Sequence, residues 1–128
     1  MPKASITTDR APNPAGPYSQ GTVQNGLLFT AGFGPQDPAS GTVPESVGDQ
    51  TRQVLTNIRA VLAERGADLD DVLKVTTHLQ HLKRDFDEYN RAYAEFFNEP
   101  YPVRTTVGSD LMDILVEIDV VVALGDAG

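Results

Sequence analysis

Residues 115–124 read Leu-Val-Glu-Ile-Asp-Val-Val-Val-Ala-Leu, an alternating pattern that predicts a β-strand with apolar residues on both faces. One face is entirely apolar and can pack against helices. The other face combines Leu115, Val121 and Ala123 with the acidic Glu117 and Asp119, and it needs a separate cover. Because a large apolar surface is seldom left in water, we expect copies of the chain to associate through this face.

A second strand is predicted over residues 72–79, where β-branched residues alternate along the chain. The alternation separates two faces, one with Leu73, Val75, Thr77 and Leu79 and the other with Lys74, Thr76 and His78. Further strands are expected over 19–23 and 27–31, joined by a tight turn at Asn25-Gly26, as well as over 104–108 and near Ser5.

Two helices are predicted on either side of residues 72–79, because no proline occurs between positions 45 and 99. Apolar residues recur at helical spacing over 47–65. The second helix is expected over 86–97, with Asp85 as its N-cap and an aromatic stripe along one side. The order βββαβαββ predicts a single α+β domain over 1–128, in which a mixed sheet carries both helices on one face.

The composition limits what the chain can bind. Ten Lys and Arg residues stand against eighteen Asp and Glu residues, and the formal net charge of −8 repels a phosphate backbone, so no nucleic-acid partner is expected. The absence of cysteine excludes thiolate catalysis, and His78 and His81 have no clustered carboxylates, so no metal site is expected. Without an apolar run near the roughly 18 residues of a membrane span, or a secretory signal, we expect a cytoplasmic protein with no membrane partner.

Arg104 is the first candidate for chemistry. Residues 105–128 contain five acidic residues and no Lys or Arg, so Arg104 stands alone at the start of a predicted strand. A guanidinium can hold a carboxylate through two parallel hydrogen bonds, which would suit a small anionic substrate. The alternative is a structural ion pair between Arg104 and Glu117 or Asp119 on a neighbouring strand.

Glu117 is the second candidate. Its apolar neighbours Val116 and Ile118 are expected to desolvate the carboxylate partly, a setting that suits general acid/base catalysis, and Asp119 adds a like charge on the same face. The alternative is a carboxylate that lines an interface between copies of the chain, paired with Arg104 or with a lysine.

Six fragments distributed over almost the whole chain fall into a common register: Gly16–Gln20, Leu28–Gly32, Gln50–Asn57, Tyr89–Phe97, Pro102–Val107 and Val116–Ile118. Together they resemble the Rid (YjgF-type) family of enamine/imine deaminases. The resemblance implies a chorismate-mutase-like α+β fold assembled as a homotrimer, with clefts between subunits. It also implies reactive enamine and imine acids of the 2-aminoacrylate type as substrates, hydrolysed to 2-keto acids and ammonium. No cofactor is implied, since an imine carbon is already electrophilic.

The resemblance assigns the main roles to three side chains. Arg104 would grip the substrate carboxylate, a contact worth about 1.5–3 kcal/mol per charged hydrogen bond. Glu117 would orient and activate water and relay protons, which contributes roughly 10²–10⁴-fold in rate. Tyr18 would close the cleft over the substrate.

Further residues would line the cleft. Backbone groups of Gly32 and Thr106 would contact the substrate nitrogen or the attacking water, and Asn90 would support the cleft from the second helix. Family deaminases commonly read Ser-Gly-Gln where this chain has Ala31, Gly32 and Phe33, so the cleft loses a hydroxyl and gains an aromatic ring nearby. We therefore expect Ala31 and Phe33 to make the pocket drier and differently shaped.

A second departure lies at residues 111–115, which read Leu-Met-Asp-Ile-Leu where the family often has Leu-Pro-x-Gly-Ala. This change alters the loop that approaches Glu117 and leaves the identity of the substrate open. Two other functions also stay open: a non-catalytic trimer of the same fold that binds small carboxylates or a partner protein, and a pathway-specific deaminase of a larger enamine. A ribonuclease fits poorly with the net charge of −8.

Overall fold

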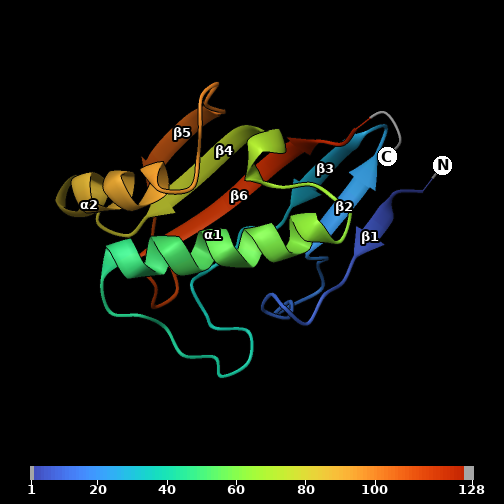
Figure 1. Ribbon diagram of the computed structural model, residues 1–128. Coiled ribbons are helices and arrows are strands. Elements are labelled where there is room, and N and C mark those ends of the chain that lie inside the picture. The colour runs from blue at the N-terminus through green and yellow to red at the C-terminus, as the bar shows by residue number, and fades with distance from the viewer. Residues whose placement is uncertain (1, 126–128) are drawn as a thin grey trace.

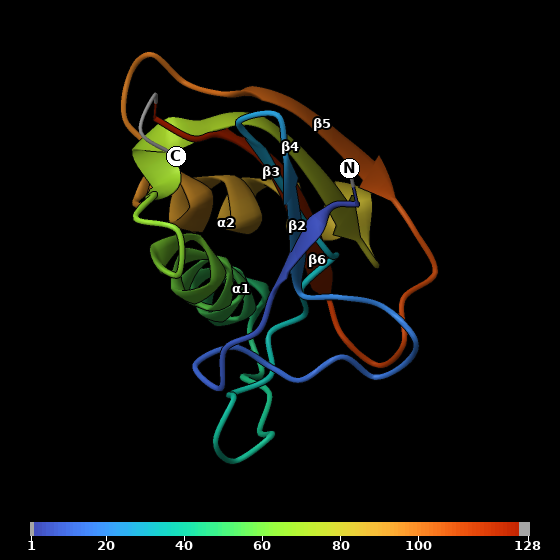
Figure 2. The same ribbon diagram turned by 90° about the vertical axis from the view of Figure 1, so that its right-hand side faces the viewer.

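The computed structural model describes residues 2–125, which form a six-stranded sheet with two helices on one of its faces (Figure 1, Figure 2). The elements follow the predicted order, with one additional short 3₁₀ helix before the fourth strand: β1 (Ala4–Ile6), β2 (Gly21–Gln24), β3 (Leu27–Thr30), α1 (Val47–Ala63), η1 (Leu69–Asp71), β4 (Val72–Leu79), α2 (Leu82–Ala94), β5 (Val103–Gly108) and β6 (Val116–Ala123). The predicted mixed sheet with both helices on one face is confirmed.

The strands lie side by side in the order β1-β2-β3-β6-β4-β5. Strands β4 and β5 are parallel because α2 crosses over between them, and the other described pairs are antiparallel. Strand β6 therefore lies inside the sheet, between β3 and β4. Its wholly apolar face packs against the helices, where Val116, Ile118, Val120 and Val122 are buried.

The hairpin between β2 and β3 is confirmed, and its turn has the predicted chemistry. Asn25 has φ 55° and Gly26 has φ 76°. A two-residue hairpin turn of this kind needs positive φ at both positions, which asparagine and glycine adopt most readily. The turn sets the register in which Gln24 lies opposite Leu27.

The predicted faces of β4 are correct except at Leu73. Val75, Thr77 and Leu79 are buried, but Leu73 is 49% exposed. The pairing with β6 shifts between Val72 and Lys74, so the strand carries an extra residue there. A β-bulge of this kind shifts the alternation of buried and exposed side chains by one position. The sequence pattern does not reveal the bulge.

The predicted start of the second helix was wrong by one turn. Helix α2 begins at Leu82 after His81, whose side chain makes no capping hydrogen bond, and it ends at Ala94. Asp85 lies inside the first turn and is nearly buried, where it accepts two hydrogen bonds from the Arg84 guanidinium at 2.8 and 3.0 Å. The aromatic stripe is confirmed as part of the core.

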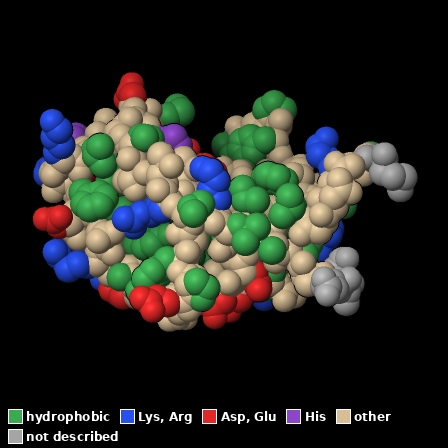
Figure 3. All heavy atoms as spheres, turned by 90° about the horizontal axis from the view of Figure 1, so that it is seen from above, with side chains coloured by type: hydrophobic (Ala, Val, Ile, Leu, Met, Phe, Trp, Pro, Cys, Tyr) green, Lys and Arg blue, Asp and Glu red, His purple; other side chains and the backbone are tan. Residues whose placement is uncertain are grey.

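The face of the sheet opposite the helices carries no helix within residues 2–125 (Figure 2). Large apolar side chains remain exposed in the strands of the sheet, including Phe29 on β3 and Val103 and Val107 on β5. Seen from above, hydrophobic side chains gather over the middle of the molecule, while acidic side chains follow one border (Figure 3). Neither helix is long and apolar enough to cross a membrane. Association through the bare sheet face stays a prediction.

Candidate functional site

Arg104 lies on β5 above an aromatic surface formed by α2. Its pairing with Val75, which is fully buried, places the Arg104 side chain on the helix face of the sheet. The guanidinium carbon is 4.5 Å from the ring centroid of Tyr93 and 5.5 Å from that of Tyr89. The Tyr89 hydroxyl is fixed in turn by a 2.6 Å hydrogen bond with Thr77. The rings support the cation through their negative faces and leave its N–H edge available.

The alternative of a structural ion pair at Arg104 is wrong for the described chain. Across residues 2–125, no carboxylate lies within 4.0 Å of Arg104. Glu117 and Asp119 alternate with the buried residues of β6, so their side chains lie on the opposite face of the sheet. Arg104 therefore keeps an uncompensated positive charge, which is the state needed to bind an anion.

A hollow of about 460 Å³ surrounds Arg104, and we call it the Arg104 hollow. Asn90 on α2 and the exposed Tyr101 contribute to its lining. The remaining lining residues are Tyr93, Ala94 and Pro102. Thr106 lies two residues further along β5 and is not part of the lining. Arg104 and Asn90, two of the predicted site residues, thus line the same hollow.

Glu117 lies on the other side of the sheet, against the backbone of Gly32. A Cβ atom added to Gly32 would be 2.7 Å from Oε2 of Glu117, so only glycine allows this approach. The neighbouring Phe33 holds the segment to β6, because its N–H donates to the carbonyl of Ile118 at 2.8 Å and its carbonyl accepts from the Ile118 N–H at 3.1 Å. This short bridge fixes the backbone beside the Glu117 carboxylate.

Two hollows meet at Glu117. The first, of about 560 Å³, includes Lys3, Ala31 and Phe29 and is called the Lys3 hollow. The second, of about 490 Å³, includes Met112 and is called the Met112 hollow. Both hollows share Tyr18, Gly32 and Glu117. These three predicted site residues are therefore brought together, with Ala31 beside them.

Phe33 contributes less to the cleft than the sequence suggested. It is among the residues that line the Met112 hollow, but only 5% of its surface is exposed and its side chain belongs to the core. Phe33 pairs with the buried Ile118, and paired residues point to the same face of a sheet. The Phe33 ring therefore lies toward the helices. Most of the aromatic surface is consequently out of reach of a ligand.

Tyr18 lies on the N-terminal loop, and its ring is half exposed. Its hydroxyl accepts a hydrogen bond from the Ala15 N–H at 2.9 Å. The loop is held by Gln20, which is 2% exposed and whose side-chain amide exchanges hydrogen bonds with Thr8 and donates to the carbonyls of Ala11 and Pro12. Sequence reasoning missed this role of Gln20, although the residue ends one of the fragments that carry the family resemblance.

The electrostatics differ between the two sides of the sheet. Burial raises the pKa of Asp119 on the bare face, and the nearby His78 and Lys74 oppose that shift. On the helix face, burial and the neighbouring Tyr89 raise the pKa of Tyr93 to about 12, against the opposing effect of Arg104. Tyr93 therefore stays protonated beneath Arg104 and serves as support rather than as a base.

No group of three or more His, Cys, Asp or Glu side chains that could hold a metal ion occurs in the part of the chain that the structure describes. The imidazole Nδ1 of His78 instead hydrogen-bonds the Ser109 hydroxyl at 2.7 Å. His81 immediately precedes α2.

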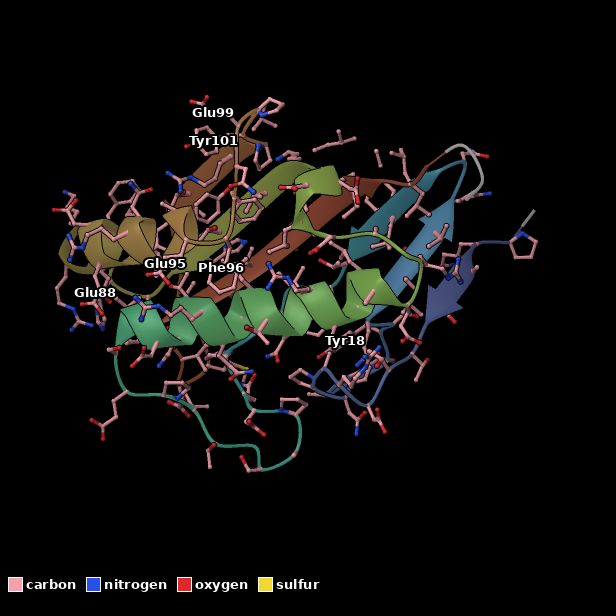
Figure 4. The ribbon with its side chains drawn as sticks, viewed as in Figure 1. Tyr18, Glu88, Glu95, Phe96, Glu99 and Tyr101 are labelled. Carbon is pink, nitrogen blue, oxygen red and sulfur yellow. The ribbon has the colours of Figure 1, made fainter. Side chains whose placement is uncertain are left out.

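The predicted site residues thus form two groups that do not meet within one copy of the chain. Glu117, Gly32 and Tyr18 lie on one side of the sheet, whereas Arg104 and Asn90 lie on the other. In Figure 4, Tyr18 of the first group lies below α1, whereas Tyr101, which lines the Arg104 hollow, lies far from it near β5. A ligand held by both groups at once would need two copies of the chain.

Comparisons with known proteins agree on the family. Residues 8–124 match the family model described as endoribonuclease L-PSP. A RutC family protein from Pyrococcus horikoshii is 43% identical over 122 residues, which cover 93% of this chain and 96% of the relative. A protein of Escherichia coli named "Putative reactive intermediate deaminase TdcF" is 36% identical over 124 residues, which cover 93% and 95%.

Solved structures give the same result. The crystal structure of E. coli TdcF with bound serine superposes with a TM-score of 0.90 at 34% identity, covering 96% of this chain and all of TdcF. The structure of RidA from an Antarctic Psychrobacter superposes with a TM-score of 0.89 at 31% identity, covering 94% of this chain and 99% of RidA.

Proposed function

We propose that this chain, which belongs to the endoribonuclease L-PSP family, is a hydrolytic deaminase of reactive enamine and imine acids of the 2-aminoacrylate type. The observation that carries the proposal is the uncompensated Arg104 guanidinium, held over the rings of α2 at the edge of a hollow. The relative named as a reactive intermediate deaminase and the bound serine in TdcF support a small carboxylate-bearing ligand.

The reaction adds water to a carbon–nitrogen double bond. An enamine acid such as 2-aminoacrylate first takes a proton from solvent on carbon and becomes the iminium. Water then attacks the iminium carbon while Glu117 accepts one water proton and returns it to the nitrogen. The carbon–nitrogen bond of the carbinolamine breaks as its hydroxyl proton passes through Glu117 to the leaving ammonia. One iminium acid and one water thus give one 2-keto acid and one ammonium. No cofactor is required, because the imine carbon is electrophilic without one.

Five more of the predicted residues have a direct place in this scheme. Arg104 binds the substrate carboxylate through its N–H edge and fixes the orientation of the imine carbon. Gly32 offers backbone groups beside Glu117, and Tyr18 exchanges its bond to Ala15 for a closed position over the substrate. Thr106 contributes backbone groups, and Asn90 contributes its polar side chain. Both lie on the same side of the sheet as Arg104.

The active site is completed between subunits. Arg104 and Glu117 lie on opposite faces of the sheet, so one copy would supply the carboxylate clamp and its neighbour would supply the acid/base group. A cyclic assembly satisfies this need with one repeated contact, and we propose a homotrimer with three equivalent sites. The exposed apolar side chains of the bare sheet face, such as Phe29 and Val107, support burial in such a contact.

The test is ammonium and 2-keto acid release from 2-aminoacrylate generated in situ by a serine or threonine dehydratase. We expect wild type to accelerate release and Arg104→Ala to lose most of that acceleration at equal assembly concentration. Arg91→Ala serves as the matched control, because Arg91 is an exposed cation of α2 outside all three hollows. Equal turnover by wild type and Arg104→Ala would refute the assignment.

A non-catalytic carboxylate-binding trimer is the second candidate, and the serine bound to TdcF favours it. This candidate and the deaminase would both bind a keto acid, but only the deaminase would turn over. Saturable keto acid binding without ammonium release would therefore favour the non-catalytic protein. The endoribonuclease in the family description is not our proposal for this chain. With a net charge of −8, the protein lacks the electrostatic attraction on which RNA affinity depends.

A further inference from the structure

The loop between β5 and β6 presents an exposed thioether beside the Glu117 site. Met112 is 90% exposed, more than any other large hydrophobic side chain in the described residues. The next residue, Asp113, has φ 63°, a conformation that residues other than glycine seldom adopt. The backbone is thus bent at the point where Met112 projects.

Amide side chains from the body of the protein fix this loop at two points. The N–H of Leu111 donates to Oε1 of Gln80 at 2.6 Å, and the N–H of Leu115 donates to Oε1 of Gln50 at 2.8 Å. Gln50 is itself buried in α1. Met112 therefore projects from an anchored loop, and its position relative to Glu117 is set by the fold.

The Met112 hollow has apolar walls on two sides. Leu111, Met112 and Ile114 come from the β5–β6 loop, and Pro12 and Ala15 come from the N-terminal loop. Among the described residues no Lys or Arg lines this hollow, whereas Asp110 does. Such a lining accepts an apolar group and repels an acidic one.

We propose that Met112 selects substrates by their side chain and favours imine acids with a branched or linear apolar chain of about four carbons over those with a methyl group. The inference rests on the proposed function. With the carboxylate on Arg104 of a neighbouring copy and the imine carbon at Glu117, the substrate side chain faces the two hollows that meet there, and the apolar walls of the Met112 hollow suit it better than the lining of the Lys3 hollow, which includes Lys3. A four-carbon chain covers more of the apolar lining of the Met112 hollow than a methyl group does.

The chain contains two methionines, Met1 and Met112, which makes a direct test possible. Labelling the methionine methyl groups with ¹³C gives an NMR reporter in the hollow, and the signal that disappears in Met112→Ser identifies it. The full assembled protein is titrated with two stable reaction products, pyruvate and 4-methyl-2-oxopentanoate. We expect the longer acid to move the Met112 signal saturably and to bind at least about tenfold more tightly than pyruvate, as pocket contacts to added methylenes allow.

A substitution then assigns the selection to Met112. Met112→Ser is expected to reduce the affinity ratio between the two acids at least about fivefold. Val43→Ser is the matched control, because Val43 is also an exposed apolar loop residue but lines none of the hollows, and it should keep the wild-type ratio.

Equal affinity for the two acids overturns the inference, as does a Met112 signal that neither acid moves. An unchanged ratio in Met112→Ser also overturns it. Failure of the proposed function is read separately, from ammonium release with 2-aminoacrylate. If the longer acid binds at Met112 with the expected preference but no ammonium is released, the selection stands as a binding property and the deaminase assignment falls.

Discussion

The carboxylate of Glu117 lies directly against the α-carbon of Gly32, so close that a methyl group on Gly32 would be 2.7 Å from Oε2. The contact joins the central strand to the segment that follows β3, and it is locked by the backbone bridge between Phe33 and Ile118. A residue without a side chain thus determines where the proposed acid/base group is held.

Gly32→Ala is expected to displace Glu117 and to lower kcat roughly 10–100-fold, because small displacements of a reacting group cost about that much. The φ of Gly32 lies outside the left-handed region, so the thermal midpoint should stay within a few degrees of wild type. Gly125→Ala is the control, since a Cβ there meets no atom within 4 Å. Wild-type kcat in Gly32→Ala would contradict the role given to Gly32 in positioning Glu117.

Gln20→Leu is expected to destabilise the N-terminal loop. The substitution leaves the buried Thr8 N–H and several carbonyls without their partner, which costs about 1–3 kcal/mol in the free energy of unfolding. Denaturant unfolding measures that loss, and hydrogen exchange of the Thr8 amide should accelerate. The control Gln53→Leu removes only one described bond, to Asn57 on the same helix. Equal stability of the two variants would contradict the role given to Gln20.

Asp119→Asn is expected to raise the thermal midpoint by a few degrees at pH 7. Burial raises the pKa of Asp119 above its ordinary 3.8. The folded state therefore loses stability as the pH rises from the ordinary pKa of the unfolded chain through the raised pKa of the folded protein. Asparagine carries no charge to desolvate, and its advantage should disappear below about pH 4, where both states of the wild-type carboxyl are protonated. The midpoint is followed from pH 3 to 8 by circular dichroism.

The exposed Asp87→Asn on α2 is the control for that series. A lower midpoint for Asp119→Asn at pH 7 would contradict the prediction and would indicate that the ionised carboxylate is paired across a subunit contact.

The arrangement of strands and helices followed from local patterns that the sequence displays directly. The alternation of β6, the Asn25-Gly26 turn and the absence of proline over 45–99 each constrain the backbone over a few residues. The errors occurred where tertiary pairing overrides such patterns. The extra residue at Leu73 is imposed by the register with β6, and Asp85 resembles an N-cap but is nearly buried within the first turn of α2.

The candidate site was predictable as a set of residues but not as a geometry. The charge distribution and the apolar neighbours singled out Arg104 and Glu117, and the family resemblance gave them roles. Their placement on opposite faces depends on the register of β5 and β6 with β4, which no short motif specifies. The aromatic support from Tyr93 was likewise interpreted only as core. Gln20 was missed because its role comes from a loop that folds back over it.

Mixing two inactive variants tests whether the site is shared between subunits. The Arg104→Ala variant keeps Glu117, and the Glu117→Gln variant keeps Arg104. Where the two variants are neighbours, a site that takes Arg104 from one and Glu117 from the other is complete. In a cyclic assembly formed at random from equal amounts, about one quarter of the sites regain both residues, since each is intact with a probability of one half. Co-expression with two different tags, followed by tandem purification, isolates the mixed assemblies for the ammonium assay. We expect clear recovery in mixed assemblies and none in either parent, whereas inactivity of the mixed assemblies would mean that Arg104 and Glu117 act within one subunit or do not act together.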